Sequence, residues 1–218
     1  MNLAICSYRE QVKNWPENGR HILAQYTDDS IIVYQAYQKE IGHFAVSKGY
    51  FGGAFSYARM SWIKPNFLWM MYRSGWGTKP GQEVILAVRI SRAFFDEILE
   101  QAVVSTFHNT VFRSHDEWKH TLNTSEVRLQ WDPDHLPTGD KVERRAIQLG
   151  LRGDILEQYG KNPLEIMDIS EFVSEQREYA KPNTYSELNT PCEKVYVPQS
   201  EQIRKHVLLS SYREYGEA

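Results

Sequence analysis

Short apolar runs alternate with polar, glycine-containing and proline-containing stretches along the whole 218-residue chain. Four of these runs are typical of β-strands because they are rich in β-branched residues or alternate between polar and apolar positions. They cover residues 30–37, 83–90, 126–131 and 145–151. We expect the third strand to end at Asp132-Pro133.

Other segments have the apolar spacing of amphipathic helices. Residues 39–48 predict a short helix that Gly49 would end. Pro65 is suited to be the first residue of a helix over 65–74, which Gly75 would end. Further helices are predicted after a Ser91 cap, near residues 154–159, and from Pro163 to about Arg177, whereas residues 104–124 fit neither pattern.

Strands and helices are intermingled without a regular βαβ repeat, which favours an α+β fold. We expect a single compact domain with a mixed or antiparallel sheet and several short helices. Residues 1–19 are polar and interrupted by Trp15-Pro16 and Asn18-Gly19, so they predict an irregular N-terminal arm. The domain would then span 20–181, and residues 182–218 would form an extended C-terminal tail packed on it.

The charge of the chain is uneven. Lys and Arg number 25 against 28 Asp and Glu, a formal net charge of −3. Between residues 59 and 92, however, six basic residues face Glu83 alone, which gives a local 6 − 1 = +5. Such a strip on a mildly acidic protein suits an anionic ligand such as a nucleotide, and a solvated surface face is the alternative.

The two cysteines, Cys6 and Cys192, lie near opposite ends of the chain and show no zinc-ligand spacing. Two cysteines in a chain of this length are too few for a disulfide framework, so we expect reduced thiols and a cytoplasmic protein. No window approaches the roughly 20 apolar residues of a membrane span, so no membrane partner is expected.

The most unusual segment is 59–79, which combines three Trp and four basic residues with buried-type apolar residues. Trp and Arg are frequent binding anchors, and their planes also stack on nucleobases. If 65–74 is a helix, Asn66, Trp69 and Arg73 share one face. We interpret this face as the wall of a ligand site, and a core helix with satisfied Trp N–H groups is the alternative.

The candidate binding residues of this segment offer planar, cationic or hydrogen-bonding groups. They are Arg59, Ser61, Trp62, Lys64, Asn66, Trp69, Tyr72, Arg73 and Trp76. The catalytic candidates are Glu83, as the one acid in the basic strip, and Tyr34 and Gln35 in the first strand, where Tyr packing is the alternative. No phosphate-binding glycine loop or serine elbow is present, and the spacing of His115, Glu117 and His120 favours a polar loop over a metal site.

Several of these motifs resemble a family of bacterial and fungal proteins catalogued only as a domain of unknown function. The resemblance rests on the segments 34–37, 59–65, 67–79 and 82–83, and it extends from about Arg20 to beyond the 147–151 strand. It implies one intact domain with a site in the Trp-rich segment.

The order of strand, helix, aromatic-rich helix and strand also resembles the NAD-splitting fold of ADP-ribosyltransferases. That resemblance implies nicotinamide held between aromatic rings, a basic residue or His on the first strand and a Glu on a late strand. Here the first strand has Tyr34 and Gln35, and the late acids are Glu126 and Glu143.

Two functions are therefore expected from the sequence. The first is a nucleotide-using, ADP-ribosyltransferase-like transferase, with NAD bound at the Trp- and Arg-rich segment and a nucleic-acid or protein acceptor. The second is a non-catalytic nucleic-acid or nucleotide-binding module, for which affinity should fall steeply with salt.

Overall fold

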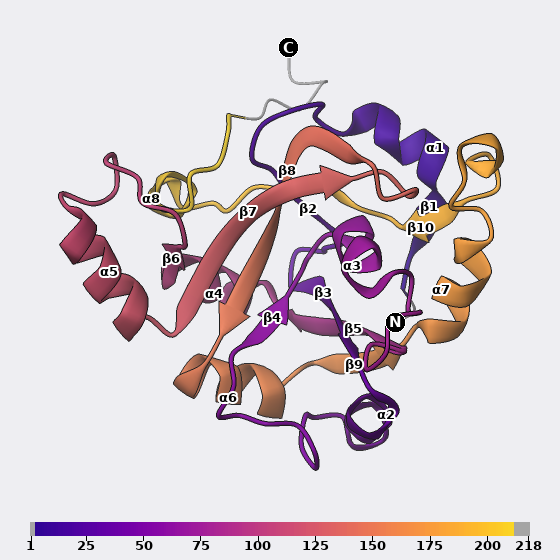
Figure 1. The fold of residues 1–218 in the computed structure, drawn as a ribbon, viewed down its shortest axis with the longest axis horizontal. Coiled ribbons are helices and arrows are strands. Elements are labelled where there is room, and N and C mark those ends of the chain that lie inside the picture. The colour runs from indigo at the N-terminus through magenta and orange to yellow at the C-terminus, as the bar shows by residue number, and fades with distance from the viewer. Residues whose placement is uncertain (1–2, 212–218) are drawn as a thin grey trace.

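The computed structural model describes residues 3–211, and these form one α+β fold with helices packed around two main sheets (Figure 1). The strands are β1 Ile5–Ser7, β2 Ile22–Ala24, β3 Ser30–Tyr37, β4 Ser61–Ile63, β5 Val84–Ser91, β6 Ala102–Val104, β7 Val127–His135, β8 Lys141–Leu151, β9 Glu165–Asp168, β10 Asn189–Pro191 and β11 Lys194–Tyr196. The α-helices are α1 Tyr8–Gln11, α2 Lys39–Lys48, α3 Phe67–Ser74, α4 Arg92–Glu100, α5 His115–Thr124, α6 Gly153–Lys161, α7 Ser170–Arg177 and α8 Glu201–His206. Two 3-10 helices complete the described chain, η1 Val12–Asn14 and η2 Pro182–Thr184.

Two sheets of different size build the centre of the molecule. The first has the order β3-β5-β9 and is antiparallel throughout, whereas the second has the order β4-β8-β7-β6 and is parallel only between β6 and β7. A single bridge between Tyr34 and Lys64 joins β3 to the chain just after β4. Beyond that bridge the two sheets separate, and this separation positions the site described below. The mixed α+β architecture expected from the sequence is confirmed.

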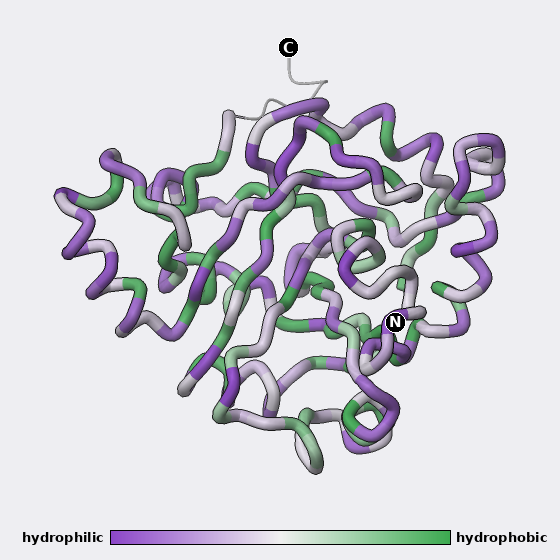
Figure 2. The backbone as a smooth tube through the Cα atoms, in the orientation of Figure 1, coloured by the Kyte–Doolittle hydropathy of each residue, from purple (hydrophilic) through white to green (hydrophobic). Residues whose placement is uncertain are grey.

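The first sheet is buried on both faces, and the chain at the centre of the molecule is largely apolar (Figure 2). On β5, Leu86 and Val88 belong to one apolar cluster, and the alternate residues Ile85 and Ala87 belong to the other. Because successive side chains of a strand point to opposite faces, the sheet lies between two cores. This explains the nearly continuous apolar run of β5 in the sequence.

Three helix boundaries follow the predicted local signals. Gly49 and Gly75 adopt left-handed conformations directly after α2 and α3, and the Ser91 hydroxyl accepts a hydrogen bond from the Phe94 N–H at the start of α4. Glycine reaches the left-handed region without a Cβ clash, and a serine oxygen satisfies a free N–H of the first turn. These predictions are confirmed.

The prediction of an irregular arm over 1–19 is wrong for the described part of that segment. Residues 5–14 contain β1, α1 and η1, and β1 pairs with β10 near the other end of the chain. Cys6 and Cys192 form a disulfide at this junction, which corrects the expectation of two reduced thiols. Cysteine number alone could not reveal a pairing that depends on two terminal segments lying side by side.

The C-terminal segment is more structured than the extended tail expected over 182–218. β10 and β11 are extended and pair with β1 and β2, but η2 and α8 are helical. Residues 212–218 of the expected tail lie outside the described residues.

Long-range pairing explains the remaining corrections. β7 continues through Pro133 to His135, which is tolerated because β6 ends at Val104 and leaves that part of the β7 edge without a neighbour among residues 3–211. β9 pairs with the open edge of β5, so the helix expected from Pro163 begins only at Ser170.

In place of the expected polar loop, His115, Glu117 and His120 lie on α5. The Ser114 hydroxyl accepts the Glu117 N–H, and a Glu117 carboxylate oxygen accepts the Arg113 N–H. This reciprocal capping stabilises the first turn of a helix whose apolar pattern is weak.

Candidate functional site

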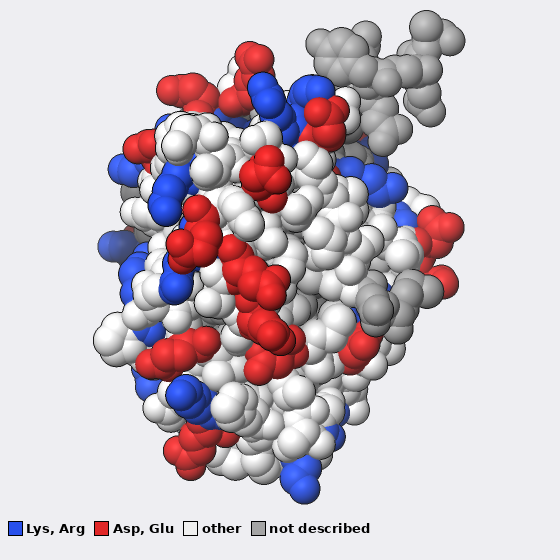
Figure 3. Space-filling model, turned by 90° about the vertical axis from the view of Figure 1, so that its right-hand side faces the viewer, with Lys and Arg blue, Asp and Glu red and all other residues white. Residues whose placement is uncertain are grey.

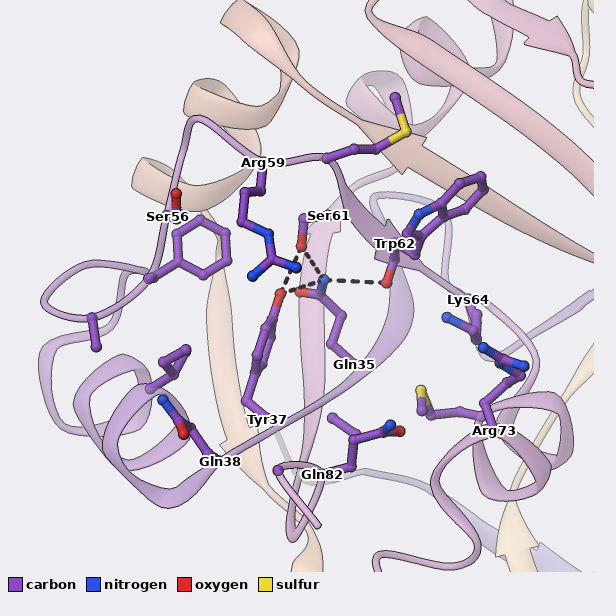
Figure 4. Close-up of a pocket in the computed structure, with 17 residues that line it drawn as sticks. Gln35, Tyr37, Gln38, Ser56, Arg59, Ser61, Trp62, Lys64, Arg73 and Gln82 are labelled. Carbon is purple, nitrogen blue, oxygen red and sulfur yellow. Dashed lines mark hydrogen bonds between the residues drawn. The ribbon is translucent and has the colours of Figure 1, made fainter. Parts of the chain in front are cut away.

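The site is a cavity of about 440 Å³ at the point where β3 and β4 separate. β3 and the start of α2 form one side, β4 and α3 another, and the loop between α2 and β4 covers part of it (Figure 4). Lining residues come from these elements and from the turn before β5: Gln35, Ala36, Tyr37, Gln38, Ile41, Ala54, Phe55, Ser56, Arg59, Met60, Ser61, Trp62, Lys64, Met70, Arg73, Gly81 and Gln82.

A neutral hydrogen-bond network forms the inner end of the cavity (Figure 4). The Gln35 amide donates to the Tyr37 and Ser61 hydroxyl groups, each at 2.9 Å, and its oxygen accepts from the Tyr159 hydroxyl at 2.8 Å. The Tyr37 and Ser61 oxygens are themselves 2.6 Å apart. The two hydroxyl groups hold two protons and only one is used between them, so the other can be donated to a ligand.

Burial keeps this network uncharged. It raises the pKa of Tyr37 to about 12, against the opposing effect of its hydrogen bonds from Ser61 and Gln35. Burial also raises the pKa of Tyr159 well above its ordinary value. The network therefore offers neutral polar groups at neutral pH, which suit an amide or hydroxyl group of a ligand.

Lys64 is the most unusual residue of the cavity. Its side chain is only 5% exposed, and within residues 3–211 its ammonium group forms no hydrogen bond or ion pair. Burial, and to a smaller extent the nearby Arg73 guanidinium, lower the pKa of Lys64 to about 8, and the charge of Asp132 opposes both effects. A buried cation without a partner is costly, so an anion at this position would be bound favourably.

Two guanidinium groups add to this positive charge. Arg73, on α3, lies beside Lys64, and Arg59 reaches over the cavity from the loop before β4 (Figure 4). Within residues 3–211, none of the residues that line the cavity is an Asp or Glu. The charge is therefore arranged for an anionic ligand.

The negative charge of the chain gathers elsewhere. Figure 3 shows acidic side chains on the side of the molecule that lies to the right in Figure 1, where α7 contributes exposed Glu171 and Glu175. The other members of the basic strip are partly engaged: Arg89 pairs with Glu165, and the Lys79 ammonium donates to the Arg73 carbonyl oxygen. The net charge of −3 therefore differs in sign from the local charge of the cavity, which is positive.

The structure separates the three catalytic candidates. Gln35 lies in the cavity, but Tyr34, the adjacent residue of β3, points to the opposite face and packs on Phe67 in the second core. Glu83 is exposed outside the cavity, where its carboxylate accepts the Gly81 N–H at 2.8 Å. Tyr34 is therefore corrected, because residues next to each other on a strand point to opposite faces, and Glu83 is corrected because its carboxylate lies outside the cavity.

The binding candidates divide in the same way. Arg59, Ser61, Trp62, Lys64 and Arg73 line the cavity, as expected. The other four belong to the packing of α3 and lie outside it: Asn66, Trp69, Tyr72 and Trp76.

These four residues have identifiable structural partners. Asn66 is the N-cap of α3 and accepts the Trp69 N–H at 2.6 Å, so Pro65 precedes the helix by two positions. Trp69 is buried and its ring stacks on His135, as does the ring of Tyr72. The Trp76 indole N–H donates to the Pro137 carbonyl oxygen. The alternative interpretation of a packing helix therefore describes the burial of these residues, but the buried Trp69 indole N–H has no hydrogen-bond partner within residues 3–211.

Sequence reasoning missed the contribution of the covering loop and the role of Tyr37. The period of two along β3 could have identified Tyr37, because it shares a face with Gln35. Phe55 and Ser56 come from a glycine-containing loop with no comparable signal. Tyr159 lies 124 residues from Gln35 in sequence and is brought to it only by the packing of α6.

Residues 3–211 contain neither a metal-ion cluster nor a membrane-spanning helix. No group of three or more His, Cys, Asp or Glu side chains is arranged to hold a metal ion. No helix in this part of the chain combines the length and apolar character that crossing a membrane requires.

Comparison with known proteins identifies a family. The model of a family described as "Domain of unknown function (DUF4291)" matches residues 21–196, which include all the strands of both main sheets and every residue that lines the cavity. No curated protein matches the chain. On the length of the family match, the chain belongs to the DUF4291 family.

Proposed function

We propose that the protein is a nucleotide-using transferase, similar to ADP-ribosyltransferases, that binds NAD in the cavity between β3 and β4. The observation that carries the proposal is the Lys64 ammonium beside Arg73, which belongs to a residue only 5% exposed and has no protein partner within residues 3–211. A pyrophosphate group would supply the anionic oxygens that this pair lacks. Arg59, on the opposite side, would contact the same group or the adjacent ribose.

The neutral end of the cavity suits the remaining part of NAD. The Tyr37–Ser61 pair has one proton to donate, and a carboxamide oxygen is a matching acceptor. Tyr37, Phe55 and Trp62 supply aromatic surface beside this pair. A cavity of about 440 Å³ is within the usual range for small-molecule sites.

One feature departs from the ADP-ribosyltransferase resemblance. That resemblance implies a Glu on a late strand, whereas the lining residues within 3–211 include no carboxylate. Asp132, on β7, is held by a hydrogen bond from Gln148 at 2.7 Å, and its charge acts on Lys64. We therefore assign NAD binding to the lining residues and propose that Asp132, which lies outside the cavity, acts on the bound ligand only through its charge effect on Lys64.

The alternative nucleic-acid-binding function loses part of its basis in this structure. Trp69 is buried and the Trp76 N–H is bonded to a backbone carbonyl, so neither ring is free to stack on an exposed base. Trp62 is the one Trp among the lining residues, and it is partly covered. A short single-stranded oligonucleotide therefore serves as a comparison ligand in the test.

The test is calorimetric titration of the purified chain with NAD, ATP and the oligonucleotide, followed by assay of released nicotinamide. Arg73→Ala should weaken NAD binding about tenfold or more, because a charged hydrogen bond contributes about 1.5–3 kcal/mol. Arg9→Ala removes an exposed arginine of α1 and should leave affinity unchanged. Absence of NAD binding, or equal affinity in the Arg73 and Arg9 variants, would refute the proposed site.

A further inference from the structure

A second cleft, of about 390 Å³, lies where β6 ends and the chain leaves the β7–β8 pair. Its lining includes Arg20 before β2, Ser105 and His108 after β6, and Arg145 on β8. None of these residues lines the cavity between β3 and β4. Three separate segments of the chain thus bring donor groups to one place.

The strand register shows which groups face this cleft. Arg145 is opposite Pro133, and Ala146 is opposite Asp132 in the β7–β8 pair. Because side chains alternate along a strand, Arg145 and the Asp132 carboxylate lie on opposite faces of the sheet. The Asp132 carboxylate accepts from Gln148 on its own face. Asp132 also lines the cleft, and the hydrogen bond from Gln148 occupies one of its carboxylate oxygens, so two guanidinium groups and an imidazole face one carboxylate.

The donors in the cleft lack protein partners. Within residues 3–211, the side chains of Arg20, His108 and Arg145 form no hydrogen bond or ion pair. The Ser105 hydroxyl oxygen is shielded from solvent and also has no hydrogen-bond partner. Of these groups only the Ser105 oxygen is fully shielded, and buried polar atoms are usually paired, so its missing partner indicates a ligand beside the half-buried Arg20 and His108 and the exposed Arg145.

Two further observations support this conclusion. Burial lowers the pKa of His108, and the nearby Arg20 guanidinium lowers it further, so two nitrogen-rich groups lie close together without a compensating charge. β6 ends at Val104 while β7 continues to His135, so backbone groups of β7 beyond Leu129 lack a strand neighbour on that side within residues 3–211. An anion would relieve the repulsion and accept hydrogen bonds from several directions.

We propose that the cleft formed by Arg20, Ser105, His108 and Arg145 is a binding site for a phosphate group, separate from the NAD site. Two guanidinium groups, an imidazole and a hydroxyl group converge from different segments, and a tetrahedral anion offers acceptor oxygens in matching directions. The ligand class is inorganic phosphate or a small phosphate monoester. This proposal does not depend on NAD binding, because none of the four residues that define the site lines the cavity between β3 and β4.

The experiment is titration of the full chain with inorganic phosphate, followed by calorimetry and by the NMR signals of His108. Phosphate should shift the His108 imidazole resonances and raise the pKa of this group. Arg145→Ala should weaken phosphate binding at least tenfold, whereas Arg9→Ala and Arg73→Ala should change it less than twofold. Arg145 is exposed, so the variant is expected to fold, which thermal unfolding would verify.

Three outcomes would overturn the proposal: no phosphate binding, binding that does not move the His108 signals, or binding lost in Arg73→Ala but retained in Arg145→Ala. The last outcome would place the phosphate at Lys64 and Arg73. Equal suppression of binding in all three variants would indicate a general charge effect and would also contradict a built site. Failure of NAD to bind would leave each of these readouts unchanged.

Discussion

Lys64 and Glu193 are both buried ionisable residues beside the amino end of α3, and each is 5% exposed, yet their surroundings differ. One Glu193 carboxylate oxygen accepts the Phe67 N–H at 2.6 Å, and the other accepts from the Asn66 side-chain amide at 3.2 Å. Lys64 has no such partner within residues 3–211. Equal burial therefore does not imply an equal role: Glu193 is satisfied by the fold, whereas Lys64 is left for a ligand.

The direction of the pKa shifts agrees with this comparison. Burial raises the pKa of Glu193 well above its ordinary value, against the opposing effect of the Phe67 N–H. Burial lowers the pKa of Lys64 to about 8. In both residues burial disfavours the charged form, but only Glu193 gains hydrogen bonds from the protein that offset the cost.

The largest expected effect is that of Glu193→Ala on stability. The change leaves the Phe67 N–H and the Asn66 amide buried without their acceptor, at about 1–3 kcal/mol for each group. We expect the free energy of unfolding to fall by about 2–5 kcal/mol, measured by urea denaturation. Glu187→Ala, at an exposed position of the same C-terminal segment, is the matched control. A loss as small as that of the control would contradict a structural role for Glu193.

Asn66→Ala should have a smaller effect of the same kind. It removes the N-cap bond to the Trp69 N–H and one of the two contacts of Glu193, so we expect a loss of about 1–2 kcal/mol. NAD affinity, measured at a temperature where the variant remains folded, should stay within about twofold of wild type. A tenfold loss of affinity without a loss of stability would instead restore Asn66 as a binding residue.

Local patterns predicted the parts of the fold that depend on neighbouring residues. The apolar run of β3, the glycine ends of α2 and α3 and the Ser91 cap are short-range features, and they appear as expected. β1, β9 and the disulfide depend on segments far apart in sequence, so periodicity could not predict them. The same limit applies to Glu193, which meets Phe67 across 126 residues.

The candidate site shows the same division. Composition singled out the 59–79 segment, and Arg59, Lys64 and Arg73 of that segment converge on one cavity. Composition could not show which side chains of that segment point into the cavity and which pack elsewhere. Trp69 and Arg73 are one helical turn apart, and the Arg73 guanidinium carbon lies 6.0 Å from the centre of the Trp69 ring. Even so, Trp69 is buried and Arg73 is exposed. Which of two neighbours faces solvent is decided by what packs on α3, here the end of β7 with His135.

Lys64→Met should change stability in the direction opposite to that of Glu193→Ala. Replacing an unpaired buried charge by an apolar side chain of similar length should leave the free energy of unfolding unchanged or raise it by about 1–3 kcal/mol at pH 7. The same change should weaken NAD binding by about tenfold or more. Lys48→Met, at an exposed position of α2, should alter neither quantity.

The pH dependence sharpens this last prediction. The folded chain loses the Lys64 proton near pH 8, whereas the unfolded chain keeps it up to the ordinary pKa of 10.5. The unfolded state therefore binds more protons in this window, and the stability of the wild type rises with pH relative to Lys64→Met. The advantage of the variant should be greatest below pH 8 and shrink by pH 9.5, in denaturation curves recorded at both values. Because NAD is attracted by the protonated form, wild-type affinity should fall over the same interval. A stability difference that does not change with pH would show that Lys64 is not the strained, unpartnered cation on which the comparison with Glu193 depends.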